Sequence, residues 1–259
     1  MEDATDRAVY VYGVVAGDAT LDPTAEGIEA AGRPRLLAAG RLAAIVADTD
    51  GEPVPTTRQN LNGHAEVLAE AARATTVLPM RFGVVFPSER KLEEELLESR
   101  RAPLESLLDE YGGKVEVTLR GSFEDQDAVL REAAESEPEI VRVRDEVRKL
   151  PDDATYYARI RLGEMVARAV EARRAAEERR ILERLEPLAS RTARERDLPE
   201  RVVVKAAFLV ERSKLAEFDR EVDVLAGELA GRIRFSYTGP LALHSFVDLA
   251  PREEAAWVS

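Results

Sequence analysis

The chain has 259 residues, enough for one large domain or two ordinary ones, and 45% of them are hydrophobic, so it can bury a core. Its formal net charge of -13 argues against nucleic acid or an anionic membrane as a partner, because both attract clustered lysine and arginine. The absence of cysteine excludes disulfides, thiolate metal sites and cysteine nucleophiles.

The N-terminal stretch MEDATDRAVY lacks the basic region and the apolar run of a signal peptide. No segment approaches the roughly 20 apolar residues that span a bilayer. These two features predict a soluble cytoplasmic protein.

The first part of the chain alternates short apolar runs with amphipathic stretches. Runs rich in β-branched and aromatic residues predict strands, and apolar residues three or four apart after Ser or Thr predict capped helices. The expected elements are a buried strand at 9–15, a hairpin at 36–47, a helix from Thr56 or Thr57 to Ala74, an extended segment at 77–86, a helix capped by Ser88 and a helix at 103–111.

The second part begins with KVEVTLR (114–120), whose alternation predicts a strand with Glu116, Thr118 and Arg120 on a wet face. The longest helical pattern runs from Thr155 to Glu186, which would be about 48 Å long at 1.5 Å per residue. The other expected elements are a helix at 123–135, a continuation of the long helix at 188–196 beyond Pro187, a strand at 201–210, a helix at 213–229 and strands at 232–237 and 243–249.

This order of elements predicts an α+β fold, with helices on one face of a mixed sheet. We place the boundary between two domains near Gly112-Gly113, because two glycines stop a helix there. The first domain would then contain residues 1–112 and the second residues 113–259, including the long helix.

Arg81 is the one charged residue inside a long apolar stretch, in VLPMRFGVVFPSER (77–90). A buried charge must be paired and hydrogen-bonded to be tolerated. We therefore expect Arg81 to tie an extended segment to neighbouring carbonyls or to a carboxylate, with Pro79 and Pro87 bounding an edge or bulged strand.

The sequence shows no recognisable catalytic group of residues, so we expect no catalytic site, cofactor or metal. No paired metal ligands and no G-x-S-x-G or G-x-G-x-x-G motif are present. The two histidines, His64 and His244, fall in different expected domains, and His64 lies on the apolar face of its helix. The alternative is an enzyme in which Arg81, His64 and a carboxylate such as Glu66 bind a small anionic substrate.

Several stretches together resemble one protein family. They are VYVYGVV near the start, His64 before VLPMRFGVVF, YYARIRLGEMVARAV in the long helix, KAAFLVER and YTGPLALHSFV. These stretches resemble, and follow the order found in, the GvpF/GvpL proteins, which are accessory proteins of bacterial and archaeal gas vesicles. The similarity runs from about Ala8 to Val247, and its most recognisable structural signature contains Pro79, Arg81, Phe82 and Gly83.

The resemblance implies a ferredoxin-like N-terminal domain, a C-terminal α+β domain with long helices, and no enzyme activity. It implies a role in gas vesicle assembly, or as a minor structural component of the vesicle, in the cytoplasm. It also implies contact with the small hydrophobic shell protein or with other accessory proteins. A ferredoxin-like sheet also resembles an RNA-recognition motif, which Tyr10 and Tyr12 would suit, but the net charge of -13 predicts that RNA does not bind.

One segment departs from the family pattern. Members usually carry Gly-Pro-Trp-Pro-Pro-Tyr where this chain has GPLALH, at residues 239–244. We expect partner contacts along the long helix and on this turn, at Leu241, Leu243, His244 and Phe246. Replacing Leu241 and Leu243 with Asp is predicted to weaken binding of the shell protein without unfolding the chain.

Overall fold

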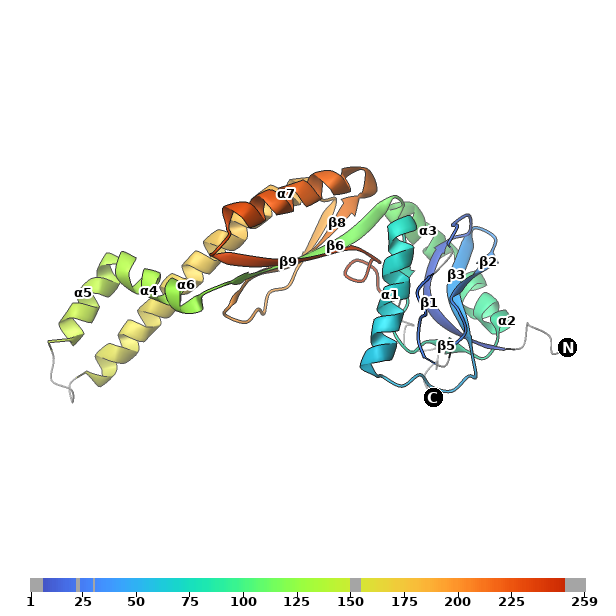
Figure 1. The fold of residues 1–259 in the computed structure, drawn as a ribbon, viewed down its shortest axis with the longest axis horizontal. Coiled ribbons are helices and arrows are strands. Elements are labelled where there is room, and N and C mark those ends of the chain that lie inside the picture. Colours follow the sequence, from blue (N-terminus) through green and yellow to red (C-terminus); the bar gives the residue numbers. More distant parts are fainter. Residues whose placement is uncertain (1–6, 22–23, 30, 150–154, 250–259) are drawn as a thin grey trace. The chain divides into compact units, whose positions relative to one another are not determined.

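The computed structural model describes residues 7–21, 24–29, 31–149 and 155–249, shown in Figure 1. It is a mixed fold of helices and two antiparallel sheets, which confirms the predicted α+β class. The strands are β1 (Ala8–Ala16), β2 (Arg35–Ala39), β3 (Leu42–Thr49), β4 (Leu78–Pro79), β5 (Val85–Phe86), β6 (Lys114–Phe123), β7 (Arg191–Arg194), β8 (Val202–Glu211) and β9 (Ile233–Leu241).

The helices are α1 (Arg58–Ala74), α2 (Glu89–Leu92), α3 (Arg101–Tyr111), α4 (Gln126–Ser136), α5 (Pro138–Val147), α6 (Tyr156–Leu185) and α7 (Leu215–Glu228). Between them lie a π-helical stretch, η2 (Glu93–Glu98), and two 3-10 turns, η4 (Glu186–Leu188) and η5 (Arg212–Lys214). Among the described residues, none of these helices combines the length and the apolar character needed to cross a membrane.

The chain forms two compact units whose segments interleave along the sequence. Unit 1 takes in the described chain up to Val117, then Ala207–Leu215, then the described chain from Thr238 onward. Unit 2 consists of Thr118–Ala206 and Ala216–Tyr237. Three of the four borders fall inside β6, β8 and β9, so these strands give residues to both units, and the fourth follows the first residue of α7. The division into domains 1–112 and 113–259 stays a prediction.

The sheet of unit 1 has the strand order β2-β3-β1-β4, and β5 also pairs with β1. Its central pair, β1 and β3, is antiparallel from Ala8↔Thr49 to Ala16↔Leu42, with a register shift between Val11 and Gly13. This strand order, with a helix between β3 and β4, is that of a ferredoxin-like sheet. The described residues between β1 and β2 form no helix, which sets the unit apart from the complete pattern.

Helices cover both faces of this sheet, and not one face as expected (Figure 1). The face that carries Val9 and Val11 packs in one core with residues of α2, η2 and α3. The face that carries Tyr10 and Tyr12 packs in a second core with residues of α1. Both faces are covered because the apolar run VYVYGVV has side chains on both sides of β1 that must be buried.

The second sheet has the order β7-β8-β6-β9, with α4 to α6 between β6 and β7 and with α7 between β8 and β9. The β-α-β-β-α-β order is therefore complete here, in the part of the chain where no ferredoxin-like pattern was expected. The prediction that a helix resumes at 188–196 is wrong. Pro187 lies in η4, and the polar stretch RTAR that follows becomes the edge strand β7 beside β8.

Two smaller expectations also fail, and one helix was not predicted. Strand β6 runs to Phe123, so α4 starts later than predicted, with Asp125 as its N-cap. Residues 138–147 form α5, which the sequence analysis did not anticipate. Residues 243–249 form turns and irregular backbone, and not a strand, because their hydrogen bonds go to local carbonyls and to the rest of unit 1.

Candidate functional site

The two most distinctive segments of the sequence meet in unit 1. Strand β4, inside VLPMRFG, pairs with β1. The segment that follows β9 lies against it, since the N–H of Leu243 donates to the carbonyl oxygen of Val77 at 3.2 Å. We call the pair of segments, residues 77–83 and 242–249, the anchor site. Two segments that are far apart along the chain thus pack together.

Arg81 lies at the surface of the anchor site. Its side chain is 68% exposed, and its Nη2 donates to Oδ1 and Oδ2 of Asp248 at 3.2 and 3.3 Å. The expectation that Arg81 is buried is therefore wrong, because the turn at Phe82 and Gly83 interrupts the extended stretch and lets the residue face solvent. The expectation that it ties the segment to a carboxylate is confirmed.

Replacing Arg81 with Met is expected to lower the free energy of unfolding by no more than about 1 kcal/mol, because ion pairs between exposed side chains contribute little. Urea denaturation of the variant and of wild type measures the difference. Arg90→Met, at another exposed arginine, is the matched control. A loss of several kcal/mol confined to Arg81→Met would contradict the expectation.

Beneath the surface, four rings form an aromatic cluster. The ring of His64 stacks on Tyr12, with centroids 5.5 Å apart, and Phe82 meets His64 edge-on at 5.8 Å. Tyr10 and Tyr12 also touch edge-to-face, at 4.9 Å. Phe82 therefore connects the signature segment to the core of unit 1 through ring contacts, which stabilise beyond the area they bury.

The polar tips of this cluster are satisfied. The hydroxyl of Tyr10 lies 2.8 Å from Nδ1 of His64 and accepts the N–H of Gly83 at 3.2 Å. His64 also forms a hydrogen bond to the backbone of Met80 that favours a protonated ring nitrogen, so the ring donates there. In the neutral imidazole the other nitrogen, Nδ1, then accepts from the hydroxyl of Tyr10. Burial, together with a smaller effect of nearby His244, lowers the pKa of His64 to about 4, so the ring is neutral at pH 7.

The proposed catalytic residues do not converge. His64 is 6% exposed and its ring is engaged by Tyr10 and Met80, whereas Arg81 faces solvent in its pair with Asp248. Glu66 lies on the exposed side of α1. In the part of the chain that the structure describes, no group of three or more His, Asp or Glu side chains is placed to hold a metal ion.

The end of the described chain is fixed by core packing and by hydrogen bonds. Leu243, Val247 and Leu249 are buried in the same core as β1. Arg100 donates from Nη1 to the carbonyl oxygen of Leu249 at 3.0 Å, a contact that satisfies a backbone acceptor beside that core. The segment is therefore an integral part of unit 1.

Glu116 provides the least expected of these contacts. It is 2% exposed, and its carboxylate accepts the N–H and the hydroxyl of Ser245, both at 2.7 Å. Burial raises the pKa of Glu116, while the two hydrogen bonds from Ser245 oppose that rise. The wet face predicted for Glu116 is wrong, because the 242–249 segment covers this part of β6.

Arg212, the last residue of KAAFLVER, has a similar structural role. Its guanidinium donates to the carbonyl oxygens of Arg73, Ala72 and Thr75 at 2.9, 2.5 and 2.5 Å. The last carbonyls of a helix lack partners within the helix, so Arg212 satisfies the end of α1. The sequence offered no signal for this contact, because the two segments are far apart along the chain.

The chain matches the family model described as gas vesicle synthesis protein GvpL/GvpF over residues 8–248. The chain belongs to this family. Among curated relatives, it is 34% identical over 247 residues to gas vesicle protein F of Streptomyces sp. (strain CB03234), a match that covers 93% of this chain and 100% of that one. It is 24% identical over 245 residues to gas vesicle protein F of Haloferax mediterranei, which covers 93% of each chain.

Two solved structures share the fold of this GvpL/GvpF protein. The crystal structure of GvpF from Anabaena sp. PCC7120 aligns with a TM-score of 0.82 at 21% identity, over 95% of this chain and 100% of that one. The GvpF structure from Microcystis aeruginosa aligns with a TM-score of 0.74, also at 21% identity, over 93% and 99%. The resemblance seen in the sequence is thus confirmed, and the protein is related to gas vesicles.

The four residues predicted to contact a partner in this family member differ in exposure. Leu243 is 1% exposed, Leu241 and Phe246 are half-buried, and His244 is exposed. Partner contact at this turn stays a prediction. Leu243 belongs to the core, which contradicts the premise that its side chain is available to a partner, and we now expect an Asp at this position to destabilise the fold.

Proposed function

We propose that this protein acts in gas vesicle assembly, or as a minor structural component of the vesicle, by binding the small hydrophobic shell protein or other accessory proteins in the cytoplasm. The observation that carries the proposal is the family match over residues 8–248. A shell protein that polymerises into an apolar-faced wall must be kept from aggregating before it is incorporated. An accessory protein can cover that apolar surface reversibly or guide its addition to a growing edge.

Exposed apolar side chains at the start of α6 support this proposal. Tyr156, Tyr157 and Ile160 are 67%, 82% and 45% exposed, and they lie within two turns of one another. Large apolar side chains that gather on a surface mark contact sites more often than isolated ones do. In contrast, the separation of Arg81, His64 and Glu66 gives the alternative of a small-molecule enzyme no support.

Deletion of the gene tests the role in the cell. We expect the deletion strain to lack normal gas-filled vesicles and the intact gene to restore them. Normal vesicles in the deletion strain would overturn the proposal. Crosslinking of the protein within intact, washed vesicles then separates the two forms of the proposal, since a structural component stays with the vesicle and an assembly factor does not.

The partner is tested in a binding assay with purified protein and shell protein, alone and together with the other accessory proteins. We expect the shell protein to be retained by the immobilised protein. No retention under any of these conditions would remove the shell protein as the partner.

A further inference from the structure

The sheet of unit 1 has an open border at β2. This strand is last in the strand order and pairs only with β3 (Figure 1). In an antiparallel pair, every second residue of a strand bonds to the neighbouring strand, and the N–H and C=O of the residues between point the other way. The outer side of β2 therefore presents backbone groups that no strand among the described residues uses.

Hydrogen bonds on either side of β3 show how this alternation runs. The carbonyl oxygen of Arg41, just before β3, accepts the N–H of Gly17, just after β1, at 2.8 Å. The carbonyl oxygen of Asp48 in β3 accepts the N–H of Gly32, ahead of β2, at 2.7 Å. Odd-numbered residues along β3 therefore bond toward β1, and even-numbered ones bond toward β2.

The pairing of β2 with β3 then identifies the outward groups. Leu37 lies opposite Ala44, an even-numbered residue, so Leu37 bonds to β3. Its neighbours Leu36 and Ala38 are the residues whose N–H and C=O point outward. Two donors and two acceptors are thus open to an extended segment, whereas a helix uses its own backbone groups internally and cannot pair with them.

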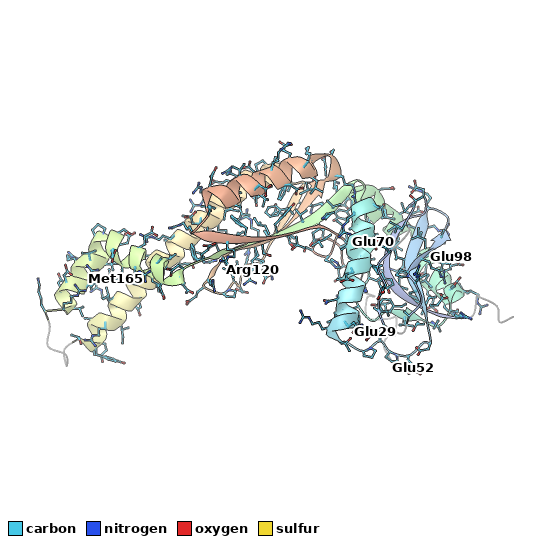
Figure 2. All side chains as sticks on the ribbon, viewed as in Figure 1. Glu29, Glu52, Glu70, Glu98, Arg120 and Met165 are labelled. Carbon is cyan, nitrogen blue, oxygen red and sulfur yellow. The ribbon has the colours of Figure 1, made fainter. Side chains whose placement is uncertain are left out.

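Apolar side chains continue to this border on both faces of the sheet. Leu36 packs at the edge of the core shared with α1, and Leu37 and Ala39 pack at the edge of the core shared with η2. All three are only half-buried. Figure 2 labels Glu98, the last residue of η2, beside this sheet. A strand placed next to β2 would cover apolar side chains on both faces, so its own residues must be apolar at successive positions.

The other border strands carry features that discourage pairing. Strands β4 and β5 have two residues each, β7 contains two exposed arginines, and β9 contains Pro240 and exposed Arg234. Short length, charge and proline are the usual means by which sheet edges avoid pairing with other chains. From Leu36 to Ala39, β2 has neither charge nor proline, and the strand is five residues long.

A second copy of the chain fits this border poorly. If two copies pair symmetrically through the outward groups of Leu36 and Ala38, the register centres on Leu37. That register brings Arg33 of each copy next to Arg41 of the other, and both side chains are exposed. Like charges that face each other across strands destabilise the pair, so the border suits a strand of a different protein better.

We propose that an extended apolar segment of a partner protein binds as an added strand beside β2. The backbone groups of Leu36 and Ala38 hold it, and its side chains extend both cores. The inference deepens the proposed function, because it names how the partner binds. It rests on that function only for the statement that the partner is the small hydrophobic shell protein or another gas vesicle protein.

The test measures binding of fluorescein-labelled peptides to the full chain by fluorescence anisotropy. The probe has a central run of valine and isoleucine as long as β2, with methyl groups on every second backbone nitrogen of the run. One of its edges is then blocked, so it forms no sheets with itself, while the other edge stays free to pair. The control peptide has the same side chains and is methylated at every nitrogen of the run. We expect the probe to bind at least about tenfold more tightly than the control, a difference of about 1.4 kcal/mol.

Variants at one position locate the binding. Ala38→Pro removes one outward N–H, and an edge strand tolerates proline where that N–H faces solvent. Ala38→Val is the matched control, since it adds a side chain of similar size and keeps the N–H. We expect Ala38→Pro to weaken binding of the probe about tenfold or more and Ala38→Val to leave it nearly unchanged. Urea denaturation shows whether each variant is folded. If the proline variant is unfolded, Ala38→Lys replaces it, because a lysine at this exposed edge position also discourages pairing.

Three outcomes would overturn the inference. They are equal binding of the probe and the fully methylated control, equal binding of the probe by the blocked variant and by Ala38→Val, and a wild-type chain that sediments as a dimer that the blocked variant does not form. The last would assign β2 to a second copy. The peptide assay contains no shell protein. Binding of the probe without retention of the shell protein would thus count against the proposed function alone, and retention of the shell protein without binding of the probe would refute the inference alone.

Discussion

Replacing Leu243 with Asp is expected to lower the free energy of unfolding by about 4 kcal/mol or more. Removing a buried leucine costs about 2–5 kcal/mol through lost burial and the cavity left behind. The carboxylate adds to that cost, because Leu243 is 1% exposed and shares its core with apolar residues such as Val9, Leu78 and Leu209. These side chains cannot pair with a buried negative charge.

Leu241→Asp is the matched control, because it is the same change two residues earlier at a half-buried position at the end of β9. We expect it to cost about 1 kcal/mol, in the usual range for partly exposed sites. Urea denaturation followed by circular dichroism measures both variants. Equal losses of stability in the two variants would show that the 242–249 segment does not complete the core. If the Leu241→Asp variant is folded, it can be used to test partner contact at the turn.

The second large effect is a loss of stability in acid that depends on His64. The folded protein lowers the pKa of His64 from 6.5 to about 4, so the folded state binds the proton less readily than the unfolded state does. As far as it depends on His64, the free energy of unfolding is therefore highest above pH 6.5 and decreases as the pH falls toward 4. A difference of about 2.5 units corresponds to about 3 kcal/mol.

His64→Asn isolates this contribution from that of the carboxylates, which also titrate in acid. Asparagine places an amide near the position of Nδ1, so Tyr10 keeps a hydrogen-bond partner, but it has no proton to gain. Free energies of unfolding measured by denaturant between pH 7.5 and pH 4 should fall more steeply for wild type than for the variant, by about 3 kcal/mol over the range. Parallel curves would mean that His64 becomes charged without cost.

Local signals predicted much of the secondary structure. Thr57 and Ser88 cap α1 and α2 as predicted. Each side-chain oxygen accepts the backbone N–H three residues later, and a contact over so short a distance along the chain can be predicted from the sequence. The hairpin of β2 and β3 turns at Gly40, where φ is +67°, a conformation that favours glycine. The long helix was expected at 155–186 and is found at Tyr156–Leu185.

The local sequence patterns did not predict the contacts that form the anchor site. The alternation of KVEVTLR does not show that Ser245 covers Glu116, and RTAR becomes a strand only because β8 is available beside it. The apolar residues around Arg81 favoured a buried guanidinium, and only the position of the turn at Gly83 shows that it faces solvent. Each of these depends on pairing between distant segments, which a single sequence does not reveal.

The interleaving of the two units has a consequence for how the protein is made. Unit 1 contains β1, yet its core also contains Leu209, Leu243 and Leu249. Translation proceeds from the N-terminus, so β1 and β3 can pair early, while the core on one face of their sheet stays incomplete until Leu243 and Leu249 have been synthesised. Folding of the sheet of unit 1 is thus completed only after Leu249 has been synthesised, and a nascent chain halted before Leu243 would expose the apolar surface that this segment covers.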